Sequence, residues 1–166
     1  MESMSVTIRR IEPGDGPLLK EIRLAALLDA PFAFARNHDE ERVQPDERWE
    51  ELAIERSAGV DHATFFALDG PSTGAIGLVG AHRLDPATVE LVSMWTVPAA
   101  RSRGVGAALV AAVVDFAAGH EVQLWVTRGN HPAQRLYERC GFELTGESQA
   151  LPSDPCKDEI RMWRRP

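Results

Sequence analysis

The chain has 166 residues, a formal net charge of −7 and a hydrophobic fraction of 44%. This length supports one domain with a proper core, and the hydrophobic fraction excludes a disordered chain. The acidic balance argues against a general nucleic-acid binder, and no apolar run approaches the ~20 residues needed to cross a membrane. The first residues lack the basic and apolar regions of a signal peptide, so we expect a cytoplasmic protein. Cys140 and Cys156 form neither a metal spacing nor a disulfide framework, and we expect no metal site.

Apolar residues recur with period two in some segments, which is typical of strands, and with period 3.6 in others, which is typical of helices. In chain order the predicted elements are a strand at 6–11, helices at 15–30 and 46–56, strands at 62–68, 75–84 and 88–97, a helix at 105–116, a strand at 121–127, a helix at 132–140, and strands at 142–145 and 158–163. Asp15 is placed to cap the first helix. This order predicts an α/β fold (α+β, mixed sheet covered by helices) in a single domain, 1–166.

The most informative stretch runs from the strand that contains Glu90, through a glycine turn, into a helix. The turn contains Arg101, Arg103, Gly104 and Gly106. Glycines let the backbone approach a ligand closely, and the first N–H groups of a helix favour negative charge. We therefore expect the turn to bind an anion, and we expect that anion to be a pyrophosphate.

The turn does not match two common phosphate-binding patterns. A P-loop needs a Gly-Lys-Ser/Thr ending, and a dinucleotide fingerprint needs Gly or Ala where this chain has Leu109. The run of Arg101, Gly104 and Gly106 instead resembles motif A of the GNAT N-acetyltransferase superfamily, which binds the pyrophosphate of acetyl-CoA. Ser102 stands where the family often has glycine. The alternative is an ordinary β-turn-α corner whose glycines serve packing.

A second stretch resembles motif B of the same family, Asn-x-x-Ala-x-x-Leu-Tyr-x-x-x-Gly-Phe. The matching residues are Asn130, Ala133, Leu136, Tyr137, Gly141 and Phe142. The two motifs cover the last half of the chain. The resemblance implies the GNAT fold, in which the pantetheine arm enters between two splayed strands, here 88–97 and 122–127. It also implies a bulge in the first of these strands.

The resemblance further implies which residues hold acetyl-CoA. They are Trp95, Thr96, Val97, Arg101, Ser102, Arg103, Gly104, Val105, Gly106, Ala107, Asn130, Ala133 and Tyr137. Solvated surface is the alternative for one of the two arginines, and a helix cap is the alternative for Asn130. A backbone N–H of Met94 or Trp95 could donate to the thioester oxygen.

Acetyl transfer to an amine also needs a base and an acid. A lysine-like amine has a pKa of ~10.4, so neutralising it near pH 7 costs about 4–5 kcal/mol. Glu90 is the expected base, at the position where some GNAT enzymes carry a catalytic glutamate; His82 or a water chain is the alternative. A one-residue slip of register would turn Glu90 to the opposite face. Tyr137 is the expected acid for the leaving thiolate, and Cys140 is expected in the core.

The predicted function is an N-acetyltransferase that moves an acetyl group from acetyl-CoA to a primary amine of a small molecule, peptide or protein, by direct attack in a ternary complex. The acceptor site is expected in segments 31–56 and 149–157, which contain Phe32, Phe34, His38 and Asp154. A non-catalytic GNAT-fold module that binds CoA is the alternative, and a nucleotide-binding domain of another family is a weaker one. The tryptophans look exposed enough for a homodimer.

Overall fold

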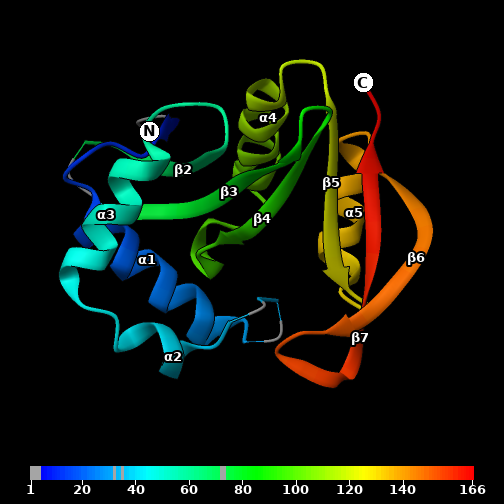
Figure 1. The fold of residues 1–166 in the computed structure, drawn as a ribbon, viewed down its shortest axis with the longest axis horizontal. Helices are drawn as coiled ribbons and strands as arrows, with labels where there is room; N and C mark the ends of the chain where they lie inside the picture. Colours follow the sequence, from blue (N-terminus) through cyan, green and yellow to red (C-terminus); the bar gives the residue numbers. More distant parts are fainter. Residues whose placement is uncertain (1–4, 32, 35, 72–73) are drawn as a thin grey trace.

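A computed structural model describes residues 5–31, 33–34, 36–71 and 74–166 (Figure 1). Phe32, which we expected in the acceptor site, lies outside the described residues. The elements are β1 (Val6–Arg10), α1 (Gly16–Asp29), α2 (His38–Arg42), α3 (Asp46–Arg56), β2 (His62–Asp69), β3 (Ala75–Asp85), β4 (Thr88–Thr96), the 3₁₀ helix η1 (Pro98–Ala100), α4 (Val105–Ala117), β5 (Glu121–Thr127), α5 (His131–Arg139), β6 (Glu143–Leu151) and β7 (Asp154–Arg164).

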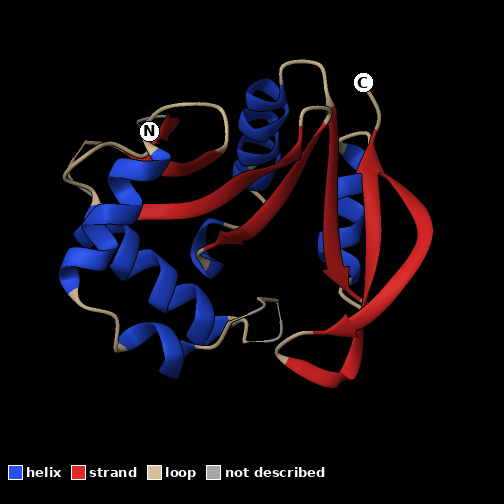
Figure 2. Cartoon of the chain, viewed as in Figure 1, coloured by secondary structure: helices blue, strands red, loops and turns tan. Residues whose placement is uncertain are grey.

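One 7-stranded sheet, in the order β1-β2-β3-β4-β5-β7-β6, joins these elements (Figure 2). Only β4 and β5 are parallel; every other pair is antiparallel. Residues 88–90 of β4 pair with residues 121–123 of β5, and the two strands then diverge toward their carboxyl ends (Figure 1). The mixed α/β fold and the splay between these strands are therefore confirmed.

The two faces of the sheet carry different helices. The face toward α4 has small and branched side chains, among them Ala63, Val79 and Leu91, which pack with the apolar stripe of α4. Gly77 permits this approach, because a Cβ there would lie 3.0 Å from Leu109 Cδ1. On the other face, large side chains such as Phe66 pack with α1 and α3. Because side chains alternate along a strand, this division also decides which polar residues face α1 and α3.

Three elements differ clearly from those predicted. The short helix α2 was missed, although Asn37 and Glu40 form its capping box: Asn37 Oδ1 accepts a hydrogen bond from Glu40 N at 2.9 Å. The final strands are much longer than 142–145 and 158–163, with only residues 152–153 between them. The edge strand β6 is largely exposed on both faces, so its sequence has no apolar alternation to reveal it.

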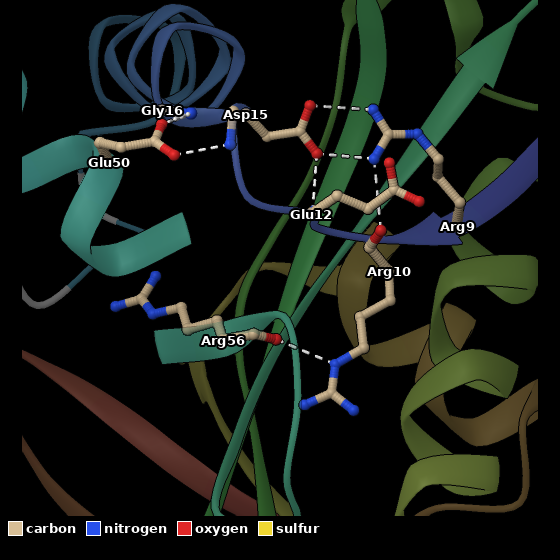
Figure 3. Close-up of polar contacts among 8 residues, drawn as sticks. Arg9, Arg10, Glu12, Asp15, Gly16, Glu50 and Arg56 are labelled. Carbon is tan, nitrogen blue, oxygen red and sulfur yellow. Dashed lines mark hydrogen bonds and ion pairs between the residues drawn. The ribbon is translucent and has the colours of Figure 1, made fainter. Parts of the chain in front are cut away.

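Asp15 occupies the N-cap position of α1, but its side chain does not cap the helix. Its carboxylate accepts hydrogen bonds from Arg9 Nη1 at 2.6 Å and from Glu12 N at 2.8 Å (Figure 3). The hydrogen bond from Arg9 lowers the pKa of Asp15. The N-terminus of α1 instead donates to the Glu50 carboxylate, from Gly14 N at 2.6 Å and Gly16 N at 3.0 Å. Glu50 thereby fixes α3 against α1.

Two of the tryptophans that looked exposed are buried. Trp49 is 4% exposed and Trp95 is 7% exposed, because both pack into the core between the sheet and α1. The expectation of exposed tryptophans was therefore wrong for these two, and they offer no surface for a dimer. Within the described ranges, no helix combines the length and hydropathy required to cross a membrane.

Candidate active site

The turn between β4 and α4 presents a run of free backbone N–H groups. In the part of the chain that the structure describes, the N–H groups of residues 102–107 have no hydrogen-bond acceptor. Ser102 (φ 64°) and Gly104 (φ 79°) both adopt the left-handed conformation, which curls the backbone ahead of the first turn of α4. A left-handed φ explains why glycine suits the position of Ser102. Successive N–H groups at a helix N-terminus form an anion site.

Gly106 has a packing reason to be glycine. A Cβ at this position would lie 2.9 Å from Leu136 Cδ2, so the glycine allows α4 to approach α5 closely. A Cβ at Gly104, by contrast, would meet nothing within 4 Å. The packing alternative therefore explains Gly106, whereas the turn conformation explains Gly104.

The two arginines of the turn are paired with carboxylates of the chain. Arg101 Nη2 lies 2.6 Å from Asp29 Oδ2, and Arg103 Nη2 lies 3.3 Å from Asp69 Oδ2. Asp29 also accepts a hydrogen bond from Trp95 Nε1 at 2.9 Å. The Trp95 hydrogen bond, followed by that of Arg101, lowers the pKa of Asp29. Asp29 was not predicted as a site residue; it fixes Arg101 beside the open edge of β4.

The strand β4 is paired on one side only beyond Glu90. On its β3 side, Val97 N donates to Ile76 O at 2.8 Å, so this N–H is not free for a ligand. On the other side, no β5 residue in the described chain pairs with residues 91–96. A bulge interrupts β4 where Ser93 adopts φ 56°, and Arg23 Nη1 donates to Ser93 Oγ at 2.8 Å. The bulge implied by the resemblance is thus present.

Helix α5 brings two predicted residues to the far side of the splay. Asn130 is the N-cap, and its Oδ1 accepts a long hydrogen bond from Ala133 N at 3.4 Å. The capping role is therefore present. Tyr137 is buried and packs against Phe142, with ring centroids 5.8 Å apart. Burial, and then Cys140, raises the pKa of Tyr137 well above its ordinary value, so the phenol holds its proton. Cys140 is half-buried beside it, as expected of a core position.

A cavity of about 530 Å³ lies over β3 and β4, beneath α1, α3 and the β6–β7 hairpin. One row of cross-strand neighbours lines its floor: His62 of β2, His82 of β3 and Glu90 of β4. Glu90 therefore faces the cavity rather than α4. Phe34 lines the wall as expected, whereas His38 and Asp154 do not line the cavity.

The Glu90 carboxylate is half-buried and electrostatically coupled to its row. Burial raises its pKa, and a hydrogen bond from Gln123 and the nearby His82 partly oppose this effect. Gln123 is held in turn by Arg161 Nε, which donates to Gln123 Oε1 at 2.9 Å. His82 Nδ1 lies 3.0 Å from His62 Nδ1, so the two rings share one hydrogen bond. The row can accept a proton at Glu90 and has two further titratable groups beside it.

Several residues of this site gave no signal in the sequence. Arg23 binds Glu41 through two hydrogen bonds of 2.8 and 3.1 Å, and its guanidinium lies 4.7 Å above the Phe34 ring. Gln123 and Asp29 reach the site through contacts far apart in the chain. The capping box at Asn37 could have located α2, which carries Glu41. For the other residues, no local pattern distinguishes a site residue from a surface residue.

Similarity to known proteins agrees with this geometry. The profile of the Acetyltransferase (GNAT) family matches residues 23–142. N-alpha-acetyltransferase RimI of Mycobacterium tuberculosis is 30% identical over 103 residues, which are 61% of this chain and 65% of that protein. Mycothiol acetyltransferase of Acidimicrobium ferrooxidans is 33% identical over 121 residues, which are 69% of this chain and 36% of that protein. The chain thus spans less than two thirds of either relative.

The fold has a close counterpart among solved structures. The crystal structure of spermidine N-acetyltransferase from Vibrio cholerae, in complex with CoA and spermine, has a TM-score of 0.74 and 20% sequence identity. The match covers 98% of this chain and 95% of that chain. With the two motifs, the splayed strands and a family profile that matches most of its length, the chain belongs to the GNAT acetyltransferase family.

Proposed function

We propose that the protein is an N-acetyltransferase that moves an acetyl group from acetyl-CoA to a primary amine by direct attack, with both substrates bound. The observation that carries this proposal is that three features meet along β4. They are the turn with free N–H groups, the unpaired edge beyond Glu90, and the cavity that Glu90 faces. Family membership and the two acetyltransferase relatives support the proposal.

The chain's backbone fits the phosphate end of acetyl-CoA. The N–H groups of residues 102–107 would hold the pyrophosphate, and the positive end of the α4 dipole would favour its charge. The edge around Trp95 and Thr96, with Asn130 and Ala133 across the splay, would hold the pantetheine arm. Arg101 and Arg103 would add positive charge at the rim, while their pairing with Asp29 and Asp69 fixes their positions.

Glu90 would remove the proton from the attacking amine. Its raised pKa makes it a stronger base than an ordinary glutamate. The Gln123 hydrogen bond and the nearby His82 favour the ionised carboxylate, which is the form that accepts the proton. The proton could pass to His82 and then to the exposed His62, whose Nδ1 lies 3.0 Å from that of His82. Burial, followed by the neighbouring His82, lowers the pKa of His62, so this ring would pass the proton on to solvent readily.

Tyr137 would return a proton to the leaving group. As the amine nitrogen bonds to the acetyl carbon and the carbon–sulfur bond breaks, the phenol would donate its proton to the thiolate sulfur. Burial keeps the phenol protonated until that moment. A backbone N–H at the β4 bulge, from Met94 or Trp95, would stabilise the charge on the carbonyl oxygen.

The test combines binding and turnover. Thermal unfolding of the protein is followed with acetyl-CoA, CoA and NAD, and CoA release is followed with a panel of primary amines and mass analysis of the products. A ligand at 100 times its Kd adds ~2.7 kcal/mol of stability. We expect both CoA forms to raise the Tm, NAD to have no effect, and at least one amine to be acetylated. Binding without turnover would favour the CoA-binding module, and the absence of binding would overturn both.

The pH profile tests the base. Because burial raises the pKa of Glu90, the carboxylate form is lost as the pH falls through a value above the ordinary ~4.3. We expect kcat/KM to fall along this acidic limb. The Gln123→Leu variant removes a hydrogen bond that favours the carboxylate, so its limb should lie at still higher pH. A limb that does not move in this variant would argue against Glu90.

We further propose that residues 1–166 act as one domain in the cytoplasm. Cys140 and Cys156 are free thiols, which suits a reducing compartment. A homodimer stays a prediction that sedimentation would test.

A further inference from the structure

Arg56 lines the cavity and forms no ion pair with any residue that the structure describes. It is the last residue of α3, and its side chain is largely buried. Among the described residues, no carboxylate lies within 4.0 Å of its guanidinium. Its side chain makes one long hydrogen bond, from Nη1 to the neutral Thr64 Oγ1 at 3.5 Å. Figure 3 shows the guanidinium extending away from the Arg56 backbone carbonyl, which accepts a hydrogen bond from Arg10.

The acidic residues around Arg56 are bound to other groups. Glu41 is held by Arg23 at 2.8 Å, and Glu55 lies 3.6 Å from Arg48. Both carboxylates are paired with other arginines, and they act on Arg56 only from beyond ion-pair distance.

The surroundings make this charge unfavourable in the free protein. Burial, followed by repulsion from Arg23, lowers the pKa of Arg56, while Glu55 and Glu41 oppose this effect. The cavity lining as a whole carries four arginines against three glutamates. A largely buried, unpaired charge is costly unless something else pairs with it. An anionic ligand group in the cavity would do so.

We propose that Arg56 binds a carboxylate carried by the acceptor amine, so that the substrate class is an amino acid or another amine with an anionic group. The planar guanidinium matches a carboxylate with two parallel hydrogen bonds, and the Thr64 hydroxyl is placed to add a third. Glu90, which lines the same cavity, would receive the amine. A polyamine lacks an anionic group and would leave Arg56 unpaired. This inference rests on the proposed acetyl transfer.

The test compares matched acceptors on matched variants. A panel of L-amino acids and the corresponding amino acid amides, with spermidine added, is assayed with wild type, Arg56→Gln, Arg56→Lys and the control Arg42→Gln. Arg42 is exposed, lies outside the cavity and pairs with Asp39. Because each acid is compared with its own amide, differences in amine reactivity cancel between variants.

We expect the wild type to prefer the acid. Loss of a charged hydrogen-bond partner predicts a KM for the acid that is roughly 10- to 100-fold higher in Arg56→Gln, while the KM for the amide changes less than about twofold. Arg56→Lys should lie between them, because a lysine keeps the charge but not the fork. The Arg42→Gln variant should match the wild type.

The carboxylate site at Arg56 and acetyl transfer itself would be overturned by different results. Equal KM values for acid and amide, or a preference for spermidine, with CoA release intact would overturn the carboxylate site and leave acetyl transfer standing. If no acceptor is acetylated, thermal shift with the same acids and amides still decides the point. Stabilisation by acids that Arg56→Gln abolishes would support the site, and equal shifts in both proteins would overturn it.

Discussion

The turn after β4 and the cavity over β3 and β4 bind ligands by different means. The turn offers backbone N–H groups of residues 102–107, most of whose side chains are small, while that of Val105 is buried in the core. The cavity offers long charged side chains from α1, α3, the sheet and the β6–β7 hairpin. Both meet at β4, whose first three residues pair with β5 and whose remainder is open on that side.

We expect the backbone site to serve the cofactor, which the family has in common, and the side-chain site to choose the acceptor, which can differ between members. A backbone site depends on the chain's conformation, so it tolerates varied side chains. A side-chain site depends on the identity of each residue, so it can be changed from protein to protein on the same sheet. Substitutions in the cavity should therefore change acceptor use and catalysis, and substitutions in the turn should change cofactor affinity and stability.

The largest effect is expected at the floor of the cavity. Glu90→Gln removes the base but keeps the size of the side chain, so kcat/KM should fall roughly 10³-fold, or about 4 kcal/mol. The affinity for acetyl-CoA should not change, because Glu90 lies in the cavity and not in the turn. Steady-state kinetics measure the loss of kcat/KM. The control is Glu143→Gln, which changes an exposed glutamate of β6. A wild-type value of kcat/KM in Glu90→Gln would show that Glu90 is not the base.

A smaller loss is expected at the other side of the splay. Tyr137→Phe keeps the ring that packs 5.8 Å from Phe142 and deletes only the hydroxyl, so kcat should fall about 10²-fold, or about 2.7 kcal/mol. The Tm should stay near that of the wild type. A loss of stability without a loss of kcat would instead make Tyr137 a packing residue.

The turn can be separated from the cavity with two glycines. Gly104 (φ 79°) and Gly59 (φ 82°) both have left-handed backbone and open space around a Cβ. Alanine at either should lower the free energy of unfolding by about 1 kcal/mol. Only Gly104→Ala should also weaken acetyl-CoA binding, because only Gly104 lies in the turn. Titration calorimetry on both variants measures the difference, and equal affinities would argue against the turn.

The smallest effect is expected at Asp29. Its lowered pKa means that its stabilising contribution is present above its unfolded pKa of about 3.9 and is lost as the pH falls through the lower folded value. Because Asp29 and Arg101 are 34% and 51% exposed, Asp29→Asn should cost no more than about 0.5 kcal/mol at pH 7. Unfolding at pH 7 and pH 3 measures this, and the difference from wild type should shrink at pH 3. If the difference in the free energy of unfolding were the same at both pH values, the charge of Asp29 would not be the cause of the stabilisation.

The sequence predicts the turn far better than the cavity. Gly104, Asn130 and Tyr137 lie in short runs with local causes: a left-handed turn, a helix cap and an apolar helix face. Helix α3 and strand β5 likewise have the predicted bounds, since their apolar periods are clear. Glu90 could be named as a base, although only the structure decides which face it occupies.

The cavity depends on contacts that no local pattern contains. Arg56 and Thr64 come together through the packing of α3 on β2, and Asp29 meets Arg101 across 72 positions of sequence. The two final strands were predicted, but their full length was not, because an exposed edge strand such as β6 needs no apolar alternation. Side-chain sites assembled from distant segments therefore require the fold before they can be recognised.

Hydrogen–deuterium exchange with and without CoA tests the division between the two sites most directly. The free N–H groups of residues 102–107 should become protected when CoA binds, and the peptides that contain Arg56 and Thr64 in the cavity wall should be unchanged. Protection confined to the turn and the open edge of β4 would support a cofactor held by the backbone. Protection in the cavity wall with none in the turn would contradict it.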